Sequence, residues 1–371
     1  MQKSFRFPFS NSRAVIERSF NPIGLANAAI LFLTCSAVSA QAPFRERLKT
    51  LPFKIAYETY INNNWEIFDM NPDGSEPVNL TNTPNEHELY PQISPDGTKI
   101  CFVVDKGEGR DAVRSIYYMD FATKQRKKVA DSGREPFWGP DSKTIAFLSQ
   151  EYPKFNVIDY YTKGINFYDL ATGKTEAHPN SENIHHLYNP GFSPDGRWIV
   201  ATVHAGMGLS HGILLIEAHG DKIINLKIPG CRPCFSPDGK QLAWGPGDHE
   251  IAVAPINLDS ENPVVGDRRV RIKDDKNKIY HVDWSPDSRF LSISRGPDGK
   301  GDLSKSGTFG PAACEIVGVH AQGWNICAVS AERNGILDLN SATEADFSML
   351  TTNGNSNKES AWYWPHRPAK Q

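Results

Sequence analysis

A short turn pattern, Ser-Pro-Asp-Gly or a close variant, recurs five times along this 371-residue chain and limits its fold more than any other feature. The copies are about 43 to 54 residues apart and begin at Ser94, Gly139, Ser193, Ser236 and Ser285. Proline presets the first central position of a tight turn, and the residue after the aspartate leaves with positive φ. Ser142 and Ser288 stand where the other copies have glycine, so we expect both to be left-handed, at a cost of roughly 1–2 kcal/mol each. Apolar runs flank every turn, which predicts repeated β-hairpins.

The hairpin repeats predict a closed ring. The strand that should follow the turn occurs six times, but only five turns precede it, and the copy without a turn is 54–57. The C-terminus supplies the missing inner strand, because 360–365 aligns on its proline with 281–286. This arrangement predicts an all-β, six-bladed β-propeller of four-stranded antiparallel blades, closed by the C-terminal strand joining the N-terminal blade. The expected blades are 53–81 plus 360–366, 90–131, 135–178, 188–229, 232–273, and 280–352 with an insertion at 296–323.

The first repeat carries a family resemblance. Residues 71–81 read Asn-Pro-Asp-Gly-Ser-Glu-Pro-Val-Asn-Leu-Thr, and 90–102 read Tyr-Pro-Gln-Ile-Ser-Pro-Asp-Gly-Thr-Lys-Ile-Cys-Phe. This sequence resembles the repeat of TolB-type propellers, which belong to the WD40-like β-propeller repeat class, and the resemblance covers 53–366. It implies a fold more than a function, because such propellers include periplasmic scaffold proteins, peptidase-associated domains and some polysaccharide lyases. The resemblance also implies a propeller alone, without the N-terminal α/β domain that precedes the propeller in TolB.

The N-terminus is typical of an exported protein. Residues 1–40 combine a basic start, an apolar stretch at 23–34 and small residues before Gln41, which predicts a cleaved signal peptide, with 41–52 as a linker. The alternative, an uncleaved anchor, is disfavoured because the apolar stretch is short for a spanning helix. We therefore expect a periplasmic or secreted protein without stable membrane insertion after cleavage. The balance of 40 basic and 43 acidic residues indicates no nucleic-acid partner.

A ring of polar residues is the first candidate site. Antiparallel blades place the five turns on one face of the ring, here the turn face, and the longer loops on the other, here the loop face. Five residues before each aligned proline, the inner strand is expected to begin at the loop-face mouth of the axial channel. Those positions hold Tyr90, Glu135, Asn189, Arg232, His281 and Ser360, with Arg134, His186 and Glu359 close by. Such a ring would suit an oriented polar ligand such as a sugar, a peptide end or a carboxylate; alternatively, its members pair with one another.

Two functions fit these features. The first is an exported, non-catalytic propeller without a cofactor that binds a protein or cell-envelope component, possibly a saccharide, through the loop face and channel. Residues 208–212 match Gly-x-Ser-x-Gly, but they fall in a loop between two expected strands. They are therefore not the strand-to-helix turn of a nucleophile elbow, which favours this hypothesis over a peptidase. The alternative is a carbohydrate-active enzyme resembling polyuronate lyases, with a divalent metal held by His186, His204 and His281 on the same face, and Arg232 neutralising the uronate. Lyases of that type have seven blades, whereas the repeats here predict six.

Overall fold

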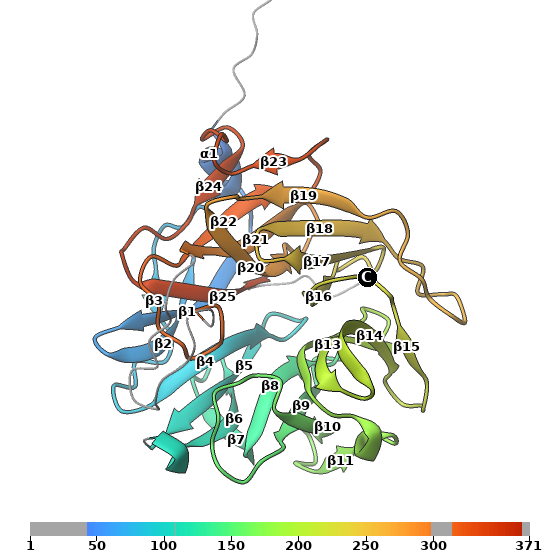
Figure 1. The fold of residues 1–371 in the computed structure, drawn as a ribbon. Helices are drawn as coiled ribbons and strands as arrows, with labels where there is room; N and C mark the ends of the chain where they lie inside the picture. Colours follow the sequence, from blue (N-terminus) through green and yellow to red (C-terminus); the bar gives the residue numbers. More distant parts are fainter. Residues whose placement is uncertain (1–42, 108, 298–313, 366–371) are drawn as a thin grey trace, which may run out of the picture. The chain divides into compact units, whose positions relative to one another are not determined.

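The computed structural model describes residues 43–107, 109–297 and 314–365. These residues form six β-sheets arranged around a central axis as the blades of a propeller (Figure 1). The expected signal peptide at 1–40 and the residues 298–313 of the expected insertion lie outside the described residues. Within the described part of the chain, no helix is both long and apolar enough to cross a membrane.

Each blade runs from an inner strand at the axis to an outer strand at the rim. The inner strands, for blades 1 to 6, are β25 (Ser356–Tyr363), β4 (His87–Ile93), β8 (Gly133–Trp138), β12 (Leu187–Phe192), β16 (Cys231–Phe235) and β20 (Asn277–Trp284). The second strands are β1 (Lys54–Ile61), β5 (Lys99–Lys106), β9 (Thr144–Gln150), β13 (Trp198–Gly206), β17 (Gln241–Gly247) and β21 (Phe290–Pro297). The third strands are β2 (Asn64–Met70), β6 (Val113–Asp120), β10 (Thr162–Asp169), β14 (Leu209–Glu217), β18 (Glu250–Pro255) and β22 (Asn325–Ser330). The outer strands are β3 (Val78–Asn79), β7 (Arg126–Asp131), β11 (Thr175–Ala177), β15 (Ile223–Asn225), β19 (Arg269–Lys273) and β24 (Phe347–Met349).

The ring closes as the sequence predicts. Strand β25 pairs antiparallel with β1, with Tyr363 opposite Lys54 and Trp362 opposite Ile55, and Figure 1 shows the red strand beside the blue one. The C-terminal strand is therefore the inner strand of the N-terminal blade, and the predicted fold class is confirmed. One strand adds to the pattern: β23 (Leu337–Asp338) pairs parallel with β19 and gives blade 5 a fifth strand. Short 3-10 helices occur at Gly109–Asp111 and Ser181–Asn183.

The recurring turn has the geometry that its residues dictate. In the first copy the Gly97 amide donates to the Ser94 carbonyl at 2.8 Å, and the Ser94 hydroxyl donates to Asp96 at 2.6 Å. Three other copies repeat the Ser-to-Asp hydrogen bond. Ser142 and Ser288 have φ of 57° and 62°, so the expected left-handed serines are confirmed. The turn is thus a structural device that reverses the inner hairpin of blades 2 to 6.

Every inner strand contains a β-bulge, where two of its residues face one residue of the second strand. The first bulge residue is left-handed in all six strands, with φ between 46° and 57°, at Tyr90, Glu135, Asn189, Arg232, His281 and Glu359. Two expectations need correction. The ring residues lie within the inner strands rather than at their starts, and the sixth member is Glu359 rather than Ser360. Prolines follow four of these residues because a bulge tolerates the missing N–H.

The apolar core lies between the blades and at the seam of the ring. Phe137 and Leu148 of blade 3, for example, share a buried cluster with Leu187 and Val203 of blade 4. At the seam, the segment 41–52 is not the simple linker that we expected, because it contains helix α1 (Phe44–Lys49). The helix buries Phe44 and Leu48 in a cluster with residues of β1, β21 and β25. It therefore stabilises the junction where the ring closes.

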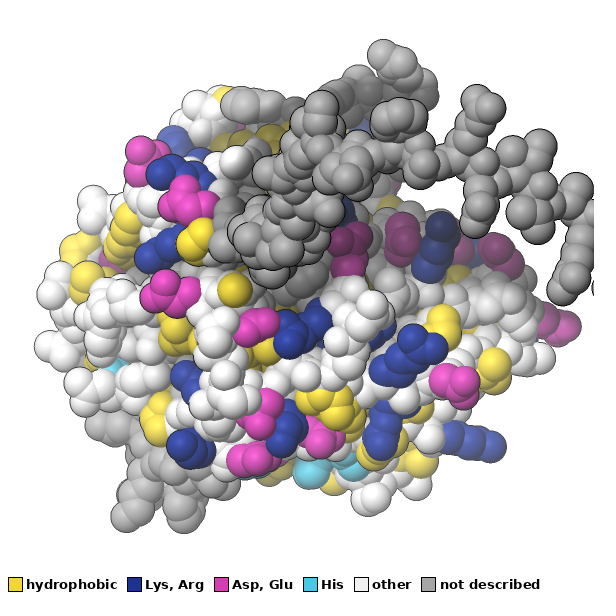
Figure 2. Space-filling model, turned by 90° about the horizontal axis from the view of Figure 1, so that it is seen from above, with side chains coloured by type: hydrophobic (Ala, Val, Ile, Leu, Met, Phe, Trp, Pro, Cys, Tyr) yellow, Lys and Arg dark blue, Asp and Glu magenta, His cyan; other side chains and the backbone are white. Residues whose placement is uncertain are grey.

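The face of the molecule seen in Figure 2 is mixed in charge. On the face that Figure 2 shows, Lys and Arg side chains are interspersed with Asp and Glu side chains and with small apolar areas. The sequence has 40 basic and 43 acidic residues, and this view shows no large area of a single sign. A binding site is therefore better sought in the shape and chemistry of the channel than in a charged surface.

Candidate functional site

The six bulge residues meet in the channel and bind one another. The Asn189 side chain donates to the Tyr90 hydroxyl at 3.2 Å, and the Arg232 guanidinium donates to the Asn189 side-chain oxygen at 3.0 Å. The Glu135 carboxylate accepts the Asn189 backbone N–H at 3.1 Å. His281 Nε2 lies 2.9 Å from the Glu359 carboxylate, which in turn lies 3.6 Å from Arg232. The structure therefore brings the predicted ring together as one connected polar cluster, here called the polar ring.

Burial determines the charge of the polar ring. Desolvation, with Asp159 and Glu359 nearby, raises the pKa of Glu135 to about 8, and desolvation raises the pKa of Glu359 in spite of Arg232. Burial and Arg232 hold the pKa of His281 well below its usual range, so its imidazole is neutral at pH 7. Burial alone would lower the pKa of Arg232, but the carboxylates of Asp159 and Glu359 hold it well above its usual value. Arg232 is thus the fixed positive charge of the cluster.

Two loops reach over the polar ring on the loop face. Arg134, one of the predicted ligand-binding residues, donates to the carbonyls of Ile158 and Asn156 and fixes the β9–β10 loop. That loop carries Asp159, which pairs with Arg232 at 3.2 Å. Its Phe155 shares a buried cluster with Val319, which follows the expected insertion's undescribed part. Tyr90, Glu135, Arg232, His281 and Glu359 are all 5% exposed or less. That the polar ring binds a ligand stays a prediction.

Two of the three histidines of the metal hypothesis are neighbours, and the third lies apart from them. The His204 backbone N–H donates to the His186 carbonyl at 3.0 Å, and the rings of both histidines lie near Tyr160. His186 also contacts Glu151 at 2.6 Å and the Ala205 carbonyl at 2.8 Å. His281 lies in the polar ring against Glu359. Within 43–107, 109–297 and 314–365, no group of three or more His, Cys, Asp or Glu side chains could hold a metal ion. The described residues therefore do not bring these imidazoles to one point.

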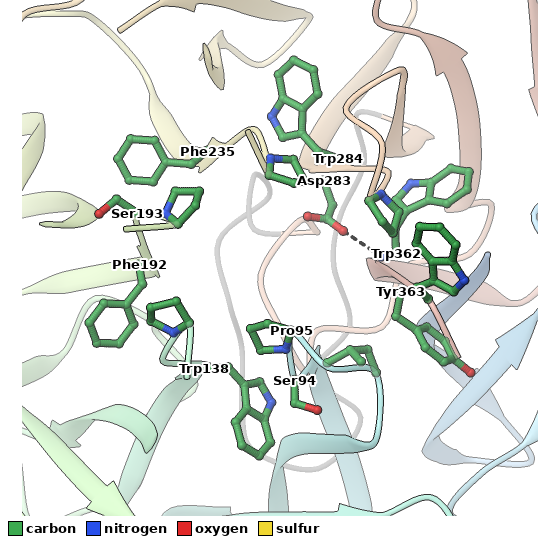
Figure 3. Close-up of a pocket in the computed structure, with 16 residues that line it drawn as sticks. Ser94, Pro95, Trp138, Phe192, Ser193, Phe235, Asp283, Trp284, Trp362 and Tyr363 are labelled. Carbon is green, nitrogen blue, oxygen red and sulfur yellow. Dashed lines mark hydrogen bonds between the residues drawn. The ribbon is translucent and has the colours of Figure 1, made fainter. Parts of the chain in front are cut away.

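A cavity opens at the other end of the channel, on the turn face. Its volume is about 280 Å³, and its walls come from all six inner strands and the turns after them (Figure 3). Five of the turn prolines contribute, together with a set of large aromatic side chains. The aromatic residues are Trp138, Phe192, Phe235, Trp284, Trp362, Tyr363 and Trp364. We call this cavity the turn-face pocket.

One carboxyl group lies in the turn-face pocket. Asp283 Oδ2 accepts the Trp362 backbone N–H at 2.7 Å, and the Cys234 thiol lies 3.5 Å from Oδ1. Figure 3 shows this carboxylate pointing toward the middle of the pocket. Burial raises the pKa of Asp283 to about 6, although hydrogen bonds from Trp362 and Cys234 lower it. The carboxylate is therefore ionised at neutral pH although it is partly desolvated, at a cost to the folded state.

Replacing Asp283 with asparagine should stabilise the protein at alkaline pH. The pKa of Asp283 is about 6 in the folded protein and about 3.9 in the unfolded chain. The free energy of unfolding therefore falls as the pH increases between these two values. Because Asp283 is half-buried and water screens part of the effect, we expect Asp283→Asn to gain about 1–2 kcal/mol at pH 8. Little gain is expected at pH 4. Calorimetric unfolding at the two pH values measures the difference, and a loss of stability at pH 8 would contradict the account.

The turn-face pocket was missed at the sequence level, although its signal is visible there. An aromatic residue immediately precedes four of the five turn motifs: Trp138, Phe192, Phe235 and Trp284. In the structure this position faces the channel end, and the Trp138 and Trp284 indoles donate to backbone carbonyls of the preceding blade. The longer and more variable loops had instead favoured a site on the loop face. Glu58, Asp159 and Lys358, which surround the polar ring, had no sequence signal at all.

Comparisons with known proteins agree with the fold. No protein-family model matches the chain. The chain is 29% identical over 126 residues to the uncharacterized peptidase YuxL of Bacillus subtilis. The aligned residues make up 32% of this chain and 18% of that protein. Among solved structures, TolB from Acinetobacter baumannii has a TM-score of 0.56 at 19% identity, covering 83% of this chain and 66% of that one. A putative TolB from Agrobacterium tumefaciens has a TM-score of 0.50 at 15% identity, covering 81% and 89%.

These likenesses concern the fold. The chain spans less than a fifth of the curated relative and about two thirds of the first TolB structure. A chain from a nidogen/laminin complex has a TM-score of 0.55 at 9% identity, so very different proteins share this architecture. The chain is a TolB-like β-propeller by fold, and its function must be argued from its own residues.

Proposed function

We propose that this chain is an exported, non-catalytic β-propeller that binds a segment of a protein of the cell envelope in its axial channel. The turn-face pocket carries the proposal, because aromatic and proline side chains from every blade converge there on a cavity of about 280 Å³. Concave sites lined by aromatic side chains with a few convergent polar groups are typical of binding sites. Extended segments commonly bind in such aromatic-lined grooves.

The entry face of this proposal differs from the face that the sequence suggested. On the loop face, Asn189 of the polar ring is half-buried and the other five members are buried. Phe155 packs against Val319 on the same face. On the turn face, Pro194 and Pro237 are exposed at the rim and Phe192 is half-buried. A segment would therefore enter from the turn face and meet the aromatic walls first.

The ionisable groups support binding rather than catalysis. Glu135, Arg232, His281 and Glu359 contact one another, and none of them lines the turn-face pocket. A general acid or base must reach the group whose proton it transfers. In the pocket itself, Asp283 is the only carboxyl group and has no histidine, lysine or arginine beside it among the lining residues. Such a pocket can hold a ligand but offers no acid–base pair.

A peptide selection tests the proposed function. Random 12-residue peptides displayed on phage are selected on the wild-type protein, and the selected peptides are then measured against two variants. Phe192→Ala removes a half-buried wall of the turn-face pocket, whereas Tyr152→Ala removes an aromatic side chain that is 46% exposed on the loop face. Loss of about 1–3 kcal/mol of binding energy is expected for Phe192→Ala only. Peptides that are sensitive to Tyr152→Ala and indifferent to Phe192→Ala would overturn the proposal.

Export has a separate test. If residues 1–40 are a signal peptide, a bacterial host with an outer membrane should release the protein to its periplasm with Gln41 as the first residue. N-terminal sequencing of the periplasmic fraction measures this directly. Retention of Met1 on a protein found in the cytoplasm would contradict export and leave the binding proposal untouched.

A further inference from the structure

The charged groups that line the turn-face pocket are of a single sign. Its lining residues include a single carboxyl group, that of Asp283, and no lysine, arginine or histidine. The remaining walls are aromatic rings, prolines, serines and Ile93, and the lining exposes polar and apolar atoms in about equal measure. A ligand that fills this space therefore meets one negative charge among aromatic rings and neutral polar groups.

Asp283 lacks a positive partner within the described residues. Its two oxygens lie near the Trp362 backbone N–H and the Cys234 thiol, and it forms no ion pair with any side chain that the structure describes. Even a half-buried carboxylate without a counter-ion carries a desolvation cost, and proteins usually pair a carboxylate that is removed from water. Figure 3 shows the carboxylate on the cavity side, with its hydrogen bond to Trp362 drawn as a dashed line. Its natural counter-ion would arrive with a ligand.

The aromatic walls favour the same kind of ligand. Ammonium and guanidinium groups are attracted to the faces of tryptophan and phenylalanine rings, and a long aliphatic stem packs well against apolar walls. Two tryptophans of the lining adjoin Asp283. Trp284 follows it in the sequence, and the Trp362 backbone N–H donates a hydrogen bond to its carboxylate. The cavity volume of about 280 Å³ leaves room for a single long side chain.

We propose that the bound protein segment inserts a lysine or arginine side chain into the turn-face pocket, with its cationic end at Asp283 and its stem against the aromatic rings. This inference rests on the proposed function, because it names the residue type that enters the same pocket. The polar ring lies further along the same inner strands, so the inserted side chain ends before it. Asp283 then sets the specificity of the site for a basic residue.

Three matched pentapeptides test this inference: acetyl-Gly-Gly-X-Gly-Gly-amide, where X is lysine, arginine or norleucine. Norleucine keeps the aliphatic stem and removes the charge. Binding is followed by NMR through the indole N–H signals of the pocket tryptophans, with uniformly labelled protein. We expect the lysine and arginine peptides to bind at least tenfold more tightly than the norleucine peptide. Equal affinity of the three peptides would overturn the inference.

Variants of the protein complete the test. Asp283→Asn should remove the tenfold preference, and Asp283→Glu should retain it because the charge is kept. Glu332→Gln, which removes an exposed charge of the same sign from blade 6 outside the pocket lining, should change nothing. An undiminished lysine preference in Asp283→Asn overturns the inference, as does absence of pentapeptide binding. If selected 12-residue peptides still depend on Phe192 in that case, the proposed function stands without the basic residue.

Discussion

A chain that ends at Asn355 should fail to form a stable closed propeller. This truncation removes β25 and leaves β1 without its inner neighbour. It also removes the buried side chains of Trp362 and Tyr363, each worth about 1.5–3 kcal/mol of apolar burial. Since a domain is typically stable by only about 5–15 kcal/mol, these losses and the lost β25–β1 pairing should abolish cooperative unfolding. Calorimetry should show a broad transition or none.

The polar contacts of β25 add to this effect. The Lys358 ammonium, fully buried, donates to the carbonyls of Ile316 and Val319 at 2.6 and 3.0 Å. The Tyr363 hydroxyl donates to Asp69 at 2.7 Å, across the sheet of blade 1. Truncation would leave these acceptors without their donors, which costs more than an exposed hydrogen bond. A chain that ends at Pro365 keeps all of β25 and is the matched control. Equal melting temperatures of the two chains would contradict closure by the C-terminal strand.

Arg232→Met should cause the largest loss of any single substitution in the channel. Arg232 is 5% exposed and balances Asp159 at 3.2 Å and Glu359 at 3.6 Å. Its guanidinium also lies over the rings of Tyr188 and Tyr280. Removing one partner of a buried charge pair typically costs about 3–5 kcal/mol, because the other charge stays buried and uncompensated. We expect a loss of this size at pH 8, measured by chemical denaturation.

The pH dependence of Arg232→Met identifies the cause of the loss. Without the guanidinium, Glu359 becomes neutral only by binding a proton, which the unfolded chain releases at neutral pH. Stability of the variant should therefore rise as pH falls from 8 to 5, relative to the wild type. Adding Asp159→Asn to Arg232→Met should restore part of the loss at pH 8. Arg289→Met, at a half-exposed position, is the control with little effect. An equal loss at both pH values would mean that lost packing, not charge, is responsible.

The fold was predictable because its signal is local and repeated. The turn motif dictates its own hydrogen bonds, and the left-handed Ser142 and Ser288 follow from its geometry. The count of strands against turns predicted the closure through β25. The error of one residue at Glu359 has a physical origin. The C-terminal strand lacks a turn motif, and one more residue separates its bulge from Pro365 than separates the other bulges from their prolines.

The candidate site was only partly predictable. Five members of the polar ring were named correctly, because each lies at a fixed distance from its proline. The covering of that ring was not predictable, since it depends on contacts between distant segments such as Phe155 with Val319 and Arg134 with Ile158. The turn-face pocket could have been predicted from the residues that the short turns bring together at the end of the channel. The aromatic residue that precedes four of the five turns is the pattern that indicates it.

Entry of a peptide segment into the axial channel from the turn face can be seen in a crystal structure of the protein with a selected 12-residue peptide. We expect peptide density at the turn face, with one side chain inserted between Phe192 and Trp284 and its end near Asp283. A peptide bound on the loop face above Tyr152, with the turn-face pocket empty, would contradict entry from the turn face.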